Sequence, residues 1–461
     1  MFPSSDTPHE QRSALRRFLN RWDVDQATFF AVMVRGWQFV SGPITISLIV
    51  LYFSKAMQGY YYAFMPILAA QLFFELSLHV VIINSASHEW ALLETDATGR
   101  VTGDSVALSR LAGLVRFTSR WYAVVSLLFV IAIGAIGVSV LSKQSLPASE
   151  WMGPWIATVI ATGLMLFILP YQATLEGCGQ LPTVNRYRLA QAVTGTIVVA
   201  ACIVSGFGLW AIAASAFSRF VWEVILIAVR YRPFFGSLRI VEATSDREWL
   251  NEAWPFMWRL AVQGVAGYFA MHLVTLVIFS YHGDEAGGRF GMTWQILTAL
   301  QAGAFAWVET RRPLFGNLIA QREFDRLDKL WLRLSSISTG LFVAAVAALI
   351  VAIWALQIMT WPIAEKIGNR MLPLTPTLML GIALIALHIP RCQNIYIRAH
   401  KRDPYLIPGL VINASIGGLV WYLGRRFGAD GVVAAYLGVI VLLQLPVWSI
   451  VWNKCRREWH V

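Results

Sequence analysis

The sequence predicts an all-α integral membrane protein with twelve transmembrane helices, and three features lead to this fold class. Only 14% of the 461 residues are charged, whereas a soluble domain carries about 25%. Charge-free runs of 31, 30 and 22 residues cover 334–364, 189–218 and 121–142, and about 20 apolar residues cross a bilayer as a helix. Basic residues also concentrate in alternate loops. Continuous apolar runs exclude an outer-membrane barrel, whose strands alternate apolar and polar residues.

The twelve spans follow from the apolar runs and from the polar segments between them. The fifth and sixth spans are separated only by the turn Ser205-Gly206-Phe207-Gly208, and the sixth and seventh contain charged residues. The expected spans are 29–53, 58–84, 119–141, 151–175, 187–206, 208–230, 253–281, 289–310, 331–357, 372–391, 403–424 and 429–453.

The distribution of Lys and Arg tests this count. With the N-terminus in the cytoplasm, 27 of the 37 basic residues fall on the cytoplasmic side, 7 fall on the other side, and three lie inside spans. This asymmetry is the positive-inside rule, and it predicts cytoplasmic termini in a bacterial inner membrane. It also accounts for the net charge of +11 without a nucleic-acid partner. The polar N-terminus lacks the pattern of a cleavable signal peptide, so the first helix is expected to remain as an anchor.

Two longer cytoplasmic connections have helical patterns. Residues 85–118 contain a polar turn and then apolar residues at helical spacing from Ala107 to Val115, and residues 321–333 mix charges with Phe324, Leu327 and Trp331. Both segments are expected to be amphipathic helices at the membrane surface or solvated helical linkers. No periplasmic loop exceeds about 15 residues, so no external domain is expected.

A weak internal repeat divides the chain into two similar halves. Arg35 corresponds to Arg259, Gly59 to Gly288 and Gly208 to Gly431, at offsets of 224, 229 and 223 residues. Each pair matches one span to the span six later, which is typical of transporters with parallel repeats. The expected parts are a cytoplasmic arm (1–28), two six-helix bundles (29–230 and 253–453), a cytoplasmic linker (231–252) and a tail (454–461).

Motifs of soluble enzymes are absent from the sequence. No Lys follows a Gly, so there is no P-loop, and His88-Glu89 lacks the second His of a zinc-protease motif. Gly206 to Ala211 fits a dinucleotide fingerprint but joins two membrane spans, and the four Cys residues show no metal-ligand spacing. We therefore expect a transporter rather than an enzyme, with no cofactor and no metal site.

Ionisable residues inside the spans are the candidates for function. A charge costs about 2.5–3.5 kcal/mol at a bilayer centre and normally faces the protein interior or a water-filled cavity. The candidates are Arg35, Arg219 and Arg259 for binding an anionic headgroup, and Glu75, His79, Glu223 and His272 for ion coupling.

Arg35 and Arg259 occupy equivalent positions in the two halves. Each lies roughly 9 Å inside its helix at a rise of about 1.5 Å per residue. If the halves face each other, both guanidinium groups reach one central cavity open to the cytoplasm. Such a set of arginines suits a phosphate or pyrophosphate that must enter a low-dielectric region, because the planar guanidinium matches the geometry of phosphate oxygens.

Each of these residues also has a structural interpretation that the sequence leaves open. Arg219 and Glu223 are four residues apart and would neutralise each other on one helix face. Glu75 and His79 form either a structural hydrogen-bond pair or a protonatable relay, and Glu75 is also a candidate partner for Arg35. Arg259 could extend along its helix so that its charge reaches the membrane surface, and His272 could be a hydrogen-bonded residue of the core. Glu309 could be solvated at an interface. Tyr60, Tyr61 and Tyr62 could belong to the aromatic belt at the membrane interface.

Several short motifs recur along the spans, at Gln58–Phe64, Leu72–Leu78, Leu175–Gln180, Pro255–Arg259, Gly287–Gly291 and Pro313–Gly316. With these motifs the chain resembles Wzx-type polysaccharide flippases of the multidrug/oligosaccharidyl-lipid/polysaccharide (MOP) exporter superfamily. The resemblance extends from about residue 30 to 450 and depends on the order and spacing of the motifs, because each motif alone is weak.

The resemblance implies two six-helix bundles in a V around a central cavity. It implies transport of an undecaprenyl-pyrophosphate-linked oligosaccharide, with the lipid tail in the bilayer at a gap near spans one and eight. A proton or sodium gradient would reset the cycle, and polysaccharide-assembly proteins are candidate partners. The chain lacks the two extra helices of the lipid II flippase branch, and it has Arg35 where the drug-extruding branch has an acid.

Three other functions compete with this interpretation. A multidrug or cation antiporter of the same fold would need a net negative charge in its cavity. Here the spans contain three arginines and only three acidic candidates, Glu75, Glu223 and Glu309, so the charge balance does not favour a cation. A membrane glycan polymerase or ligase would need a large periplasmic loop for its catalytic groups. A non-transporting scaffold would have all its span charges paired and no cavity.

Overall fold

The computed structural model describes residues 26–242, 246–359, 361–400 and 402–460, so most of the expected N-terminal arm lies outside the described residues. The first half begins with α2 and ends with a π-helix, η1. Its elements are α2 (Gln26–Tyr52), α3 (Lys55–Leu68), α4 (Gln71–Glu75), α5 (Leu78–Trp90), β1 (Leu93–Thr95), β2 (Val101–Gly103), α6 (Ser105–Leu141), α7 (Ala148–Gly177), α8 (Leu181–Val204), α9 (Trp210–Val224) and η1 (Ile225–Arg230).

The second half repeats this plan and follows a short connecting helix, α10. A second π-helix, η2, lies in its last span. The elements are α10 (Arg232–Ile240), α11 (Asp246–Met271), α12 (Leu273–His282), α13 (Asp284–Glu309), α14 (Arg312–Ala320), α15 (Phe324–Ile358), α16 (Pro362–Gly368), α17 (Leu374–Ala399), α18 (Leu406–Val439), η2 (Ile440–Gln444) and α19 (Leu445–Trp459).

The helices of the described residues have the lengths and compositions of membrane spans. Eight are long and apolar enough to cross a bilayer, or ten if each of two broken helix pairs is one span. The run Leu406–Trp459 has 54 residues and turns back at Gly428, where φ is 62° and ψ is −138°. Each of the twelve expected spans therefore falls on helical structure, although α13 is not among those that meet the apolar criterion. The protein is a multi-pass α-helical membrane protein.

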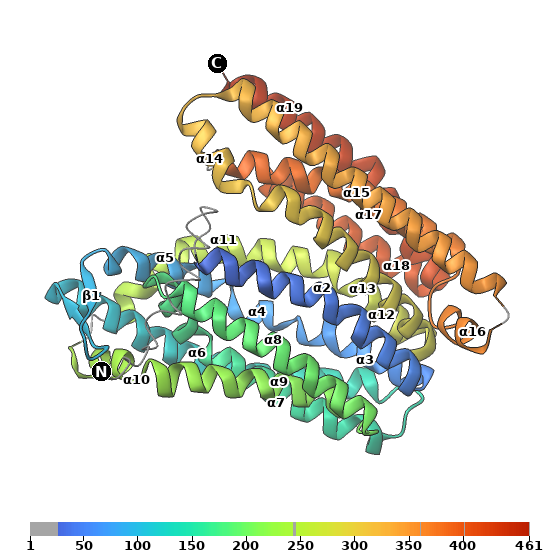
Figure 1. Cartoon of the computed structure of the whole chain (residues 1–461), viewed down its shortest axis with the longest axis horizontal. Coiled ribbons are helices and arrows are strands. Elements are labelled where there is room, and N and C mark those ends of the chain that lie inside the picture. Colours follow the sequence, from blue (N-terminus) through green and yellow to red (C-terminus); the bar gives the residue numbers. More distant parts are fainter. Residues whose placement is uncertain (1–25, 243–245, 360, 401, 461) are drawn as a thin grey trace, which may run out of the picture.

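The helices form a V, in which α11 of the second half lies along the arm made by the first half (Figure 1). At one end, called here the open end, α14, α15 and α19 of the second half diverge from α2 and α11. At the opposite, closed end, α3 and α13 cross in close contact. Small residues allow this crossing, because a β-carbon at Gly288 would lie 2.9 Å from the backbone nitrogen of Gly59. Glycine pairs of this kind let membrane helices approach to backbone contact.

Two expected surface helices are instead the first turns of long spans. Residues from Ala107 to Val115 belong to α6, which begins after Asp104, whose carboxylate accepts hydrogen bonds from the amides of Val106 and Ala107. Phe324 to Trp331 likewise begin α15. The expectation of separate surface helices is wrong because the apolar side chains of both segments are buried against their own bundles. The polar turn before α6 forms a hairpin of β1 and β2.

Aromatic residues at the start of the second span are buried as well. Tyr60, Tyr61 and Tyr62 are at most 8% exposed, so the expected membrane-interface belt is wrong for them. Tyr60 donates a hydrogen bond to the carbonyl of Leu141 at 2.9 Å. Its ring also packs edge-on against Phe279 of the second half, so these residues belong to the contact between the halves.

Candidate transport site

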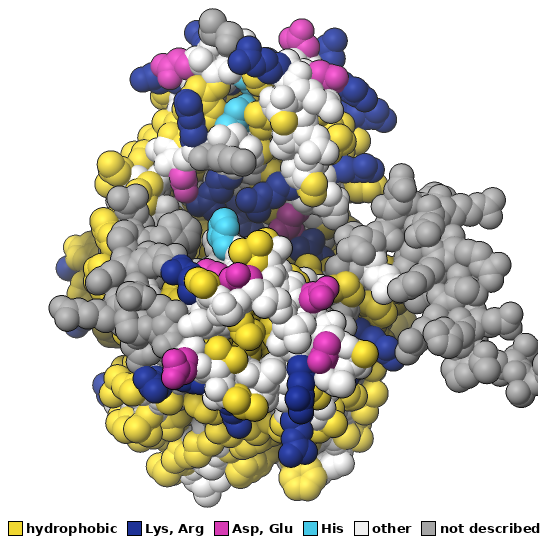
Figure 2. Space-filling view, turned by 90° about the vertical axis from the view of Figure 1, so that its left-hand side faces the viewer, with side chains coloured by type: hydrophobic (Ala, Val, Ile, Leu, Met, Phe, Trp, Pro, Cys, Tyr) yellow, Lys and Arg dark blue, Asp and Glu magenta, His cyan; other side chains and the backbone are white. Residues whose placement is uncertain are grey.

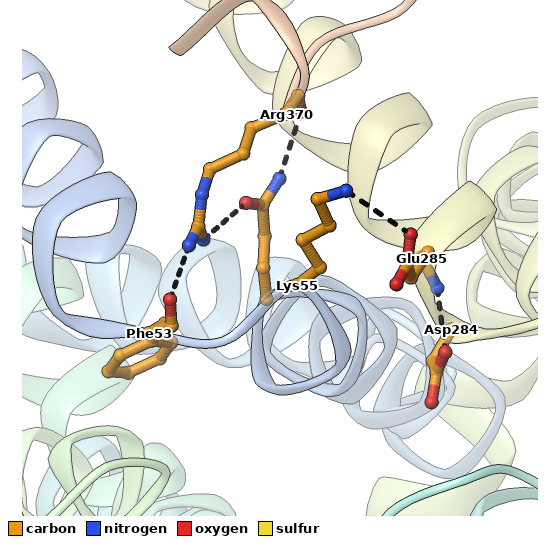
Figure 3. A network of polar contacts seen from close by, with 6 residues as sticks. Phe53, Lys55, Asp284, Glu285 and Arg370 are labelled. Atoms are coloured by element: carbon orange, nitrogen blue, oxygen red, sulfur yellow. Dashed lines mark hydrogen bonds and ion pairs between the residues drawn. The ribbon is translucent and has the colours of Figure 1, made fainter. Parts of the chain in front are cut away.

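The closed end is held by a buried arginine between the halves (Figure 3). Arg370, between α16 and α17, donates from its guanidinium to the carbonyl of Phe53 and, at 3.1 Å, to Oε1 of Gln58. Gln58 returns a hydrogen bond to the Arg370 carbonyl at 3.1 Å and donates another to the Gly288 carbonyl at 3.0 Å. Because Phe53 follows the C-terminus of α2, the guanidinium also interacts favourably with that helix dipole.

Two further contacts join the halves at this end. Lys55 and Glu285 form an exposed ion pair at 3.7 Å (Figure 3). Asp284 accepts hydrogen bonds from the hydroxyl and the backbone amide of Ser145, in the loop after α6. An opening of this end would have to break all of these contacts together, and they are called the gate below.

The open end has a hollow between the halves. Figure 2 looks into it and shows Lys and Arg side chains gathered in the recess, with His nearby. Beside it, Arg35 of α2 forms an ion pair with Glu309 of α13 at 3.0 Å. The expected pairing of Arg35 with Glu75 is therefore wrong. Both members of the observed pair are about half exposed, and the pair bridges the gap between spans one and eight.

The second span breaks beside Glu75. Helices α3–α4 and α5 meet at 49°, and Leu76 and Ser77 both have left-handed backbone conformations, with φ of 49° and 55°. Such residues are strained unless they are glycine, and strain of this kind is concentrated at functional sites. The buried carboxylate of Glu75 is in contact with Nδ1 of His79, whose side chain is 39% exposed, and the two form an ion pair when the imidazole is protonated. The contact expected between Glu75 and His79 is present, but the two residues lie on either side of the break and not on one continuous helix.

Other polar residues continue this group through the first half. Glu176 of α7 forms an ion pair with Arg188 of α8. The side-chain amide of Gln172 lies against the same guanidinium and, turned so that its oxygen faces Arg188, accepts two hydrogen bonds at 2.8 and 3.1 Å. On α9, Glu223 accepts a hydrogen bond from Gln191 at 2.7 Å. His79 and Glu223 both interact electrostatically with Glu176. These residues form the first-half polar cluster: Glu75, His79, Gln172, Glu176, Arg188, Gln191 and Glu223.

The expected Arg219–Glu223 pair does not form. Glu223 is buried against α8, and its Oε2 has no hydrogen-bond partner among the described residues. Arg219 has an exposed side chain that interacts with Tyr61 of α3. Two residues that are four apart point in directions that differ by about 40° around a helix. Here Glu223 is directed toward α8 and Arg219 toward α3, so the two side chains do not meet. No carboxylate of the described residues lies within ion-pair distance of Arg219.

The second half has a different polar centre. The seventh span bends by 45° at His272, whose ring lies 5.4 Å from that of Tyr268. Arg391 of α17 donates to Oε1 of Gln301 at 2.6 Å and lies near the sulfur of Met271, beside the bend. Arg391 forms no ion pair within the described part of the chain. The second-half centre is therefore basic, whereas the first-half cluster contains three carboxylates.

The structure places the remaining candidate residues as follows. Arg259 lies on α11, but its side chain is outside the described residues. His272 marks a helix break, where its amide donates to the Tyr268 carbonyl at 2.8 Å, and its imidazole makes no hydrogen bond to the described residues. The sequence reasoning missed Gln58, Arg370 and Arg391, and also Glu176 and Arg188. Glu176 and Arg188 were counted as loop charges because they lie near predicted span ends.

Comparisons with known proteins add information about the fold alone. No protein-family model matches the chain, and no curated protein matches it. Among solved structures, it is similar to an inward-facing multidrug resistance MATE family transporter of the MOP superfamily, with a TM-score of 0.60 and 13% identity over 90% of this chain and 99% of that one. An outward-facing structure of such a transporter gives 0.56 and 12% identity, with coverages of 94% and 96%.

A third similar structure is a MOP superfamily transporter from Pyrococcus furiosus, whose reported feature is a binding pocket of reverse polarity. Its TM-score is 0.51 at 14% identity, over 95% of this chain and 96% of that one. These similarities extend over nearly the whole length of all the chains compared. The expected architecture of two bundles in a V is therefore confirmed: this protein has the fold of MATE transporters of the MOP superfamily.

Proposed function

We propose that this protein is a flippase that moves a polyprenyl-pyrophosphate-linked oligosaccharide from the cytoplasmic to the periplasmic leaflet by alternating access. The open end would face the cytoplasm and admit the headgroup, while the lipid tail stays in the bilayer. A proton or sodium gradient would return the protein to this state. No covalent step is involved in such a cycle.

The observation that carries this proposal is the presence of an uncompensated arginine in each half. Arg219 and Arg391 have no carboxylate partner among the described residues, and Arg35 has only a half-exposed partner, Glu309. A pyrophosphate carries about two negative charges, and opposite charges about 4 Å apart attract by roughly 4 kcal/mol at an effective dielectric of about 20. Two such contacts would offset much of the cost of taking the headgroup out of water.

The first-half polar cluster is the proposed coupling site. Glu75 is buried, but its partner His79 is partly exposed, so a proton can reach the carboxylate through the imidazole. Neutralising Glu75 would remove the attraction that holds His79 across the strained break at Leu76 and Ser77. Since this break lies within the second span, protonation would change how α5 is held relative to α3 and α4.

A second candidate function is antiport of lipophilic cations. It is favoured by the buried and unpartnered Oε2 of Glu223, which offers a negative charge to a cationic substrate. The other carboxylates of the cluster, Glu75 and Glu176, are already bonded to His79 and Arg188. The balance of charge therefore favours an anionic substrate.

The test is deletion of the gene in its own host, followed by extraction and leaflet-selective labelling of lipid-linked glycans. We expect lipid-linked oligosaccharide to accumulate on the cytoplasmic leaflet and to be cleared when the intact gene is restored. Accumulation of ethidium in the deletion strain, with unchanged lipid-linked glycan, would refute the flippase and support the cation antiporter.

A further inference from the structure

A polar pocket of about 220 Å³ lies inside the second half. Its walls come from α11, α17, α18, the connection between α17 and α18, and the segment from η2 into α19, and no first-half residue lines it. The polar side chains that line it are Gln263, Arg391, Asn394, Arg398, Asp403, Asn413 and Gln444. This second-half pocket is thus rich in amides, in a bundle whose interior is otherwise mainly apolar.

Helical spacing directs these residues toward one space. On α17, Arg391, Asn394 and Arg398 recur at intervals of three and four residues, so they share a face. The π-helix η2 ends at Gln444, and Trp448 follows one turn later on α19. A π-turn shifts the register of a helix and is frequent at functional sites. Here it brings an amide and an aromatic ring to the same pocket.

Two oxygens in the pocket lack the hydrogen bonds that a folded interior normally supplies. Asn394 Oδ1 and Gln444 Oε1 are buried and have no partner among the described residues. Buried polar atoms without partners are rare in native proteins, so each calls for an explanation. Both atoms accept hydrogen bonds, and the pocket between them therefore suits a group that donates.

The charges around the pocket restrict which chemical group can bind there. Arg398 and Asp403 form an ion pair at 3.0 Å, so Arg391 leaves the lining with a net positive charge. A bare cation would meet this guanidinium, and a bare anion would meet the two amide oxygens. A hydroxyl group both donates and accepts, so it satisfies Asn394 and Gln444 together with the spare N–H groups of Arg391.

We propose that the second-half pocket binds one sugar ring of the transported headgroup. The inference rests on the proposed function, which it deepens by placing a sugar subsite directly beside Arg391, one of the arginines proposed to meet the pyrophosphate. The volume is below the 300–1,000 Å³ of a drug-sized pocket, which leaves room for one ring and not for an oligosaccharide. Trp448, whose ring stacks on Tyr405 at 4.6 Å, supplies an apolar wall for the C–H face of the sugar.

The test is saturation-transfer NMR on the full chain, purified in detergent. The probes are galactose, glucose and N-acetylglucosamine at up to about 20 mM, a range that detects binding as weak as millimolar. Tetraphenylphosphonium and inorganic pyrophosphate are the charged probes. Asn394→Leu and Gln444→Leu remove the two acceptors at similar volume, and Gln321→Leu changes an exposed amide outside the pocket. Thermal unfolding and gel-filtration profiles must match the wild type.

We expect at least one sugar to bind saturably to the wild type and to the Gln321 variant. Each pocket variant should weaken that binding by tenfold or more. If no sugar binds, or if sugar binding survives in both folded pocket variants, the subsite is refuted, and a flippase that still clears lipid-linked glycan is unaffected. Displacement of the bound sugar from the wild type by tetraphenylphosphonium would also refute the sugar subsite. Conversely, sugar binding in a protein that clears no lipid-linked glycan would refute the flippase alone.

Discussion

Arg219 and Arg391 lie within spans, and no carboxylate of the described residues forms an ion pair with either guanidinium. The sequence predicts an arginine site of Arg35, Arg219 and Arg259, and the structure pairs Arg35 with Glu309. Arg391 was missed because it lies at the end of an expected span, where an arginine normally contacts the interface. Its bond to Gln301 depends on how α13 and α17 pack, and one sequence carries no signal for that contact.

Replacement of Arg391 should affect transport more than folding. We expect Arg391→Ala to lower flipping of lipid-linked oligosaccharide by about 10- to 100-fold, since a hydrogen bond to a charged group contributes roughly 1.5–3 kcal/mol. Arg391→Lys should be intermediate, because the charge survives without the bidentate geometry. Arg402→Ala, which removes an arginine beside Trp459, is the control. Equal flipping by Arg391→Ala and wild type, at equal protein level, would exclude this residue from the substrate site.

The contact between Glu75 and His79 was predictable because the two residues are only four apart in sequence, although the break at Leu76 and Ser77 places them on different helices. Glu176 and Arg188 reach the same cluster from other helices, so their participation depends on tertiary packing. We expect Glu75→Gln to slow flipping strongly while the protein level stays normal, and to flatten the response to a pH gradient. The measurement is initial flipping rate in vesicles with imposed gradients. Gradient dependence identical to wild type would make the Glu75–His79 pair purely structural.

At the scale of elements, helix type was predictable and helix interruption was not. The charge-free runs gave the spans, but Leu76 and Ser77 break the second span without a glycine or proline to signal it. Similarly, apolar residues at helical spacing do not distinguish a surface helix from the first turns of a span. The early turns of α6 and α15 were misassigned for this reason.

The break makes a prediction about stability. Ser77 has φ of 55°, and a left-handed conformation costs a non-glycine residue roughly 1–2 kcal/mol. We therefore expect Ser77→Gly to raise the free energy of unfolding by about 1 kcal/mol. Ser85→Gly, in the regular part of α5, should lower it by about 0.5–1 kcal/mol. Thermal unfolding in detergent measures both variants, and a Ser77→Gly protein that melts below wild type would contradict the strain at this break.

At the scale of the whole molecule, two halves in a V were predictable from the repeat and from the resemblance, and the structure confirms them. The gate was not predictable, because Arg370 lies in a connection and contacts Gln58, 312 residues away in sequence. Its contacts and the glycine crossing of α3 and α13 hold the closed end. Alternating access requires this end to open while the hollow at the other end closes.

Loss of the gate arginine should shift that balance. We expect Arg370→Ala to raise the population with an open gate by about tenfold or more, since it removes hydrogen bonds from a charged donor. Spin labels at Ser54 and Asn369, both exposed near the gate, report the distance by pulsed electron resonance in a background without the four native cysteines. Lys55→Ala, which removes an exposed ion pair, is the control and should have a smaller effect. An unchanged distance distribution in Arg370→Ala would show that this arginine does not hold the gate.

The most direct test of the central claim is flipping of lipid-linked oligosaccharide by the purified protein in vesicles. The substrate pool is extracted from host membranes, and a sugar-modifying reagent that cannot cross the bilayer reports the accessible fraction. We predict that vesicles with the wild-type protein expose nearly all of the lipid-linked oligosaccharide over time. Empty vesicles and vesicles with the Arg391→Ala protein should expose little beyond their outer leaflet. If wild-type vesicles match empty vesicles with and without an imposed ion gradient, the protein is not a flippase of this substrate.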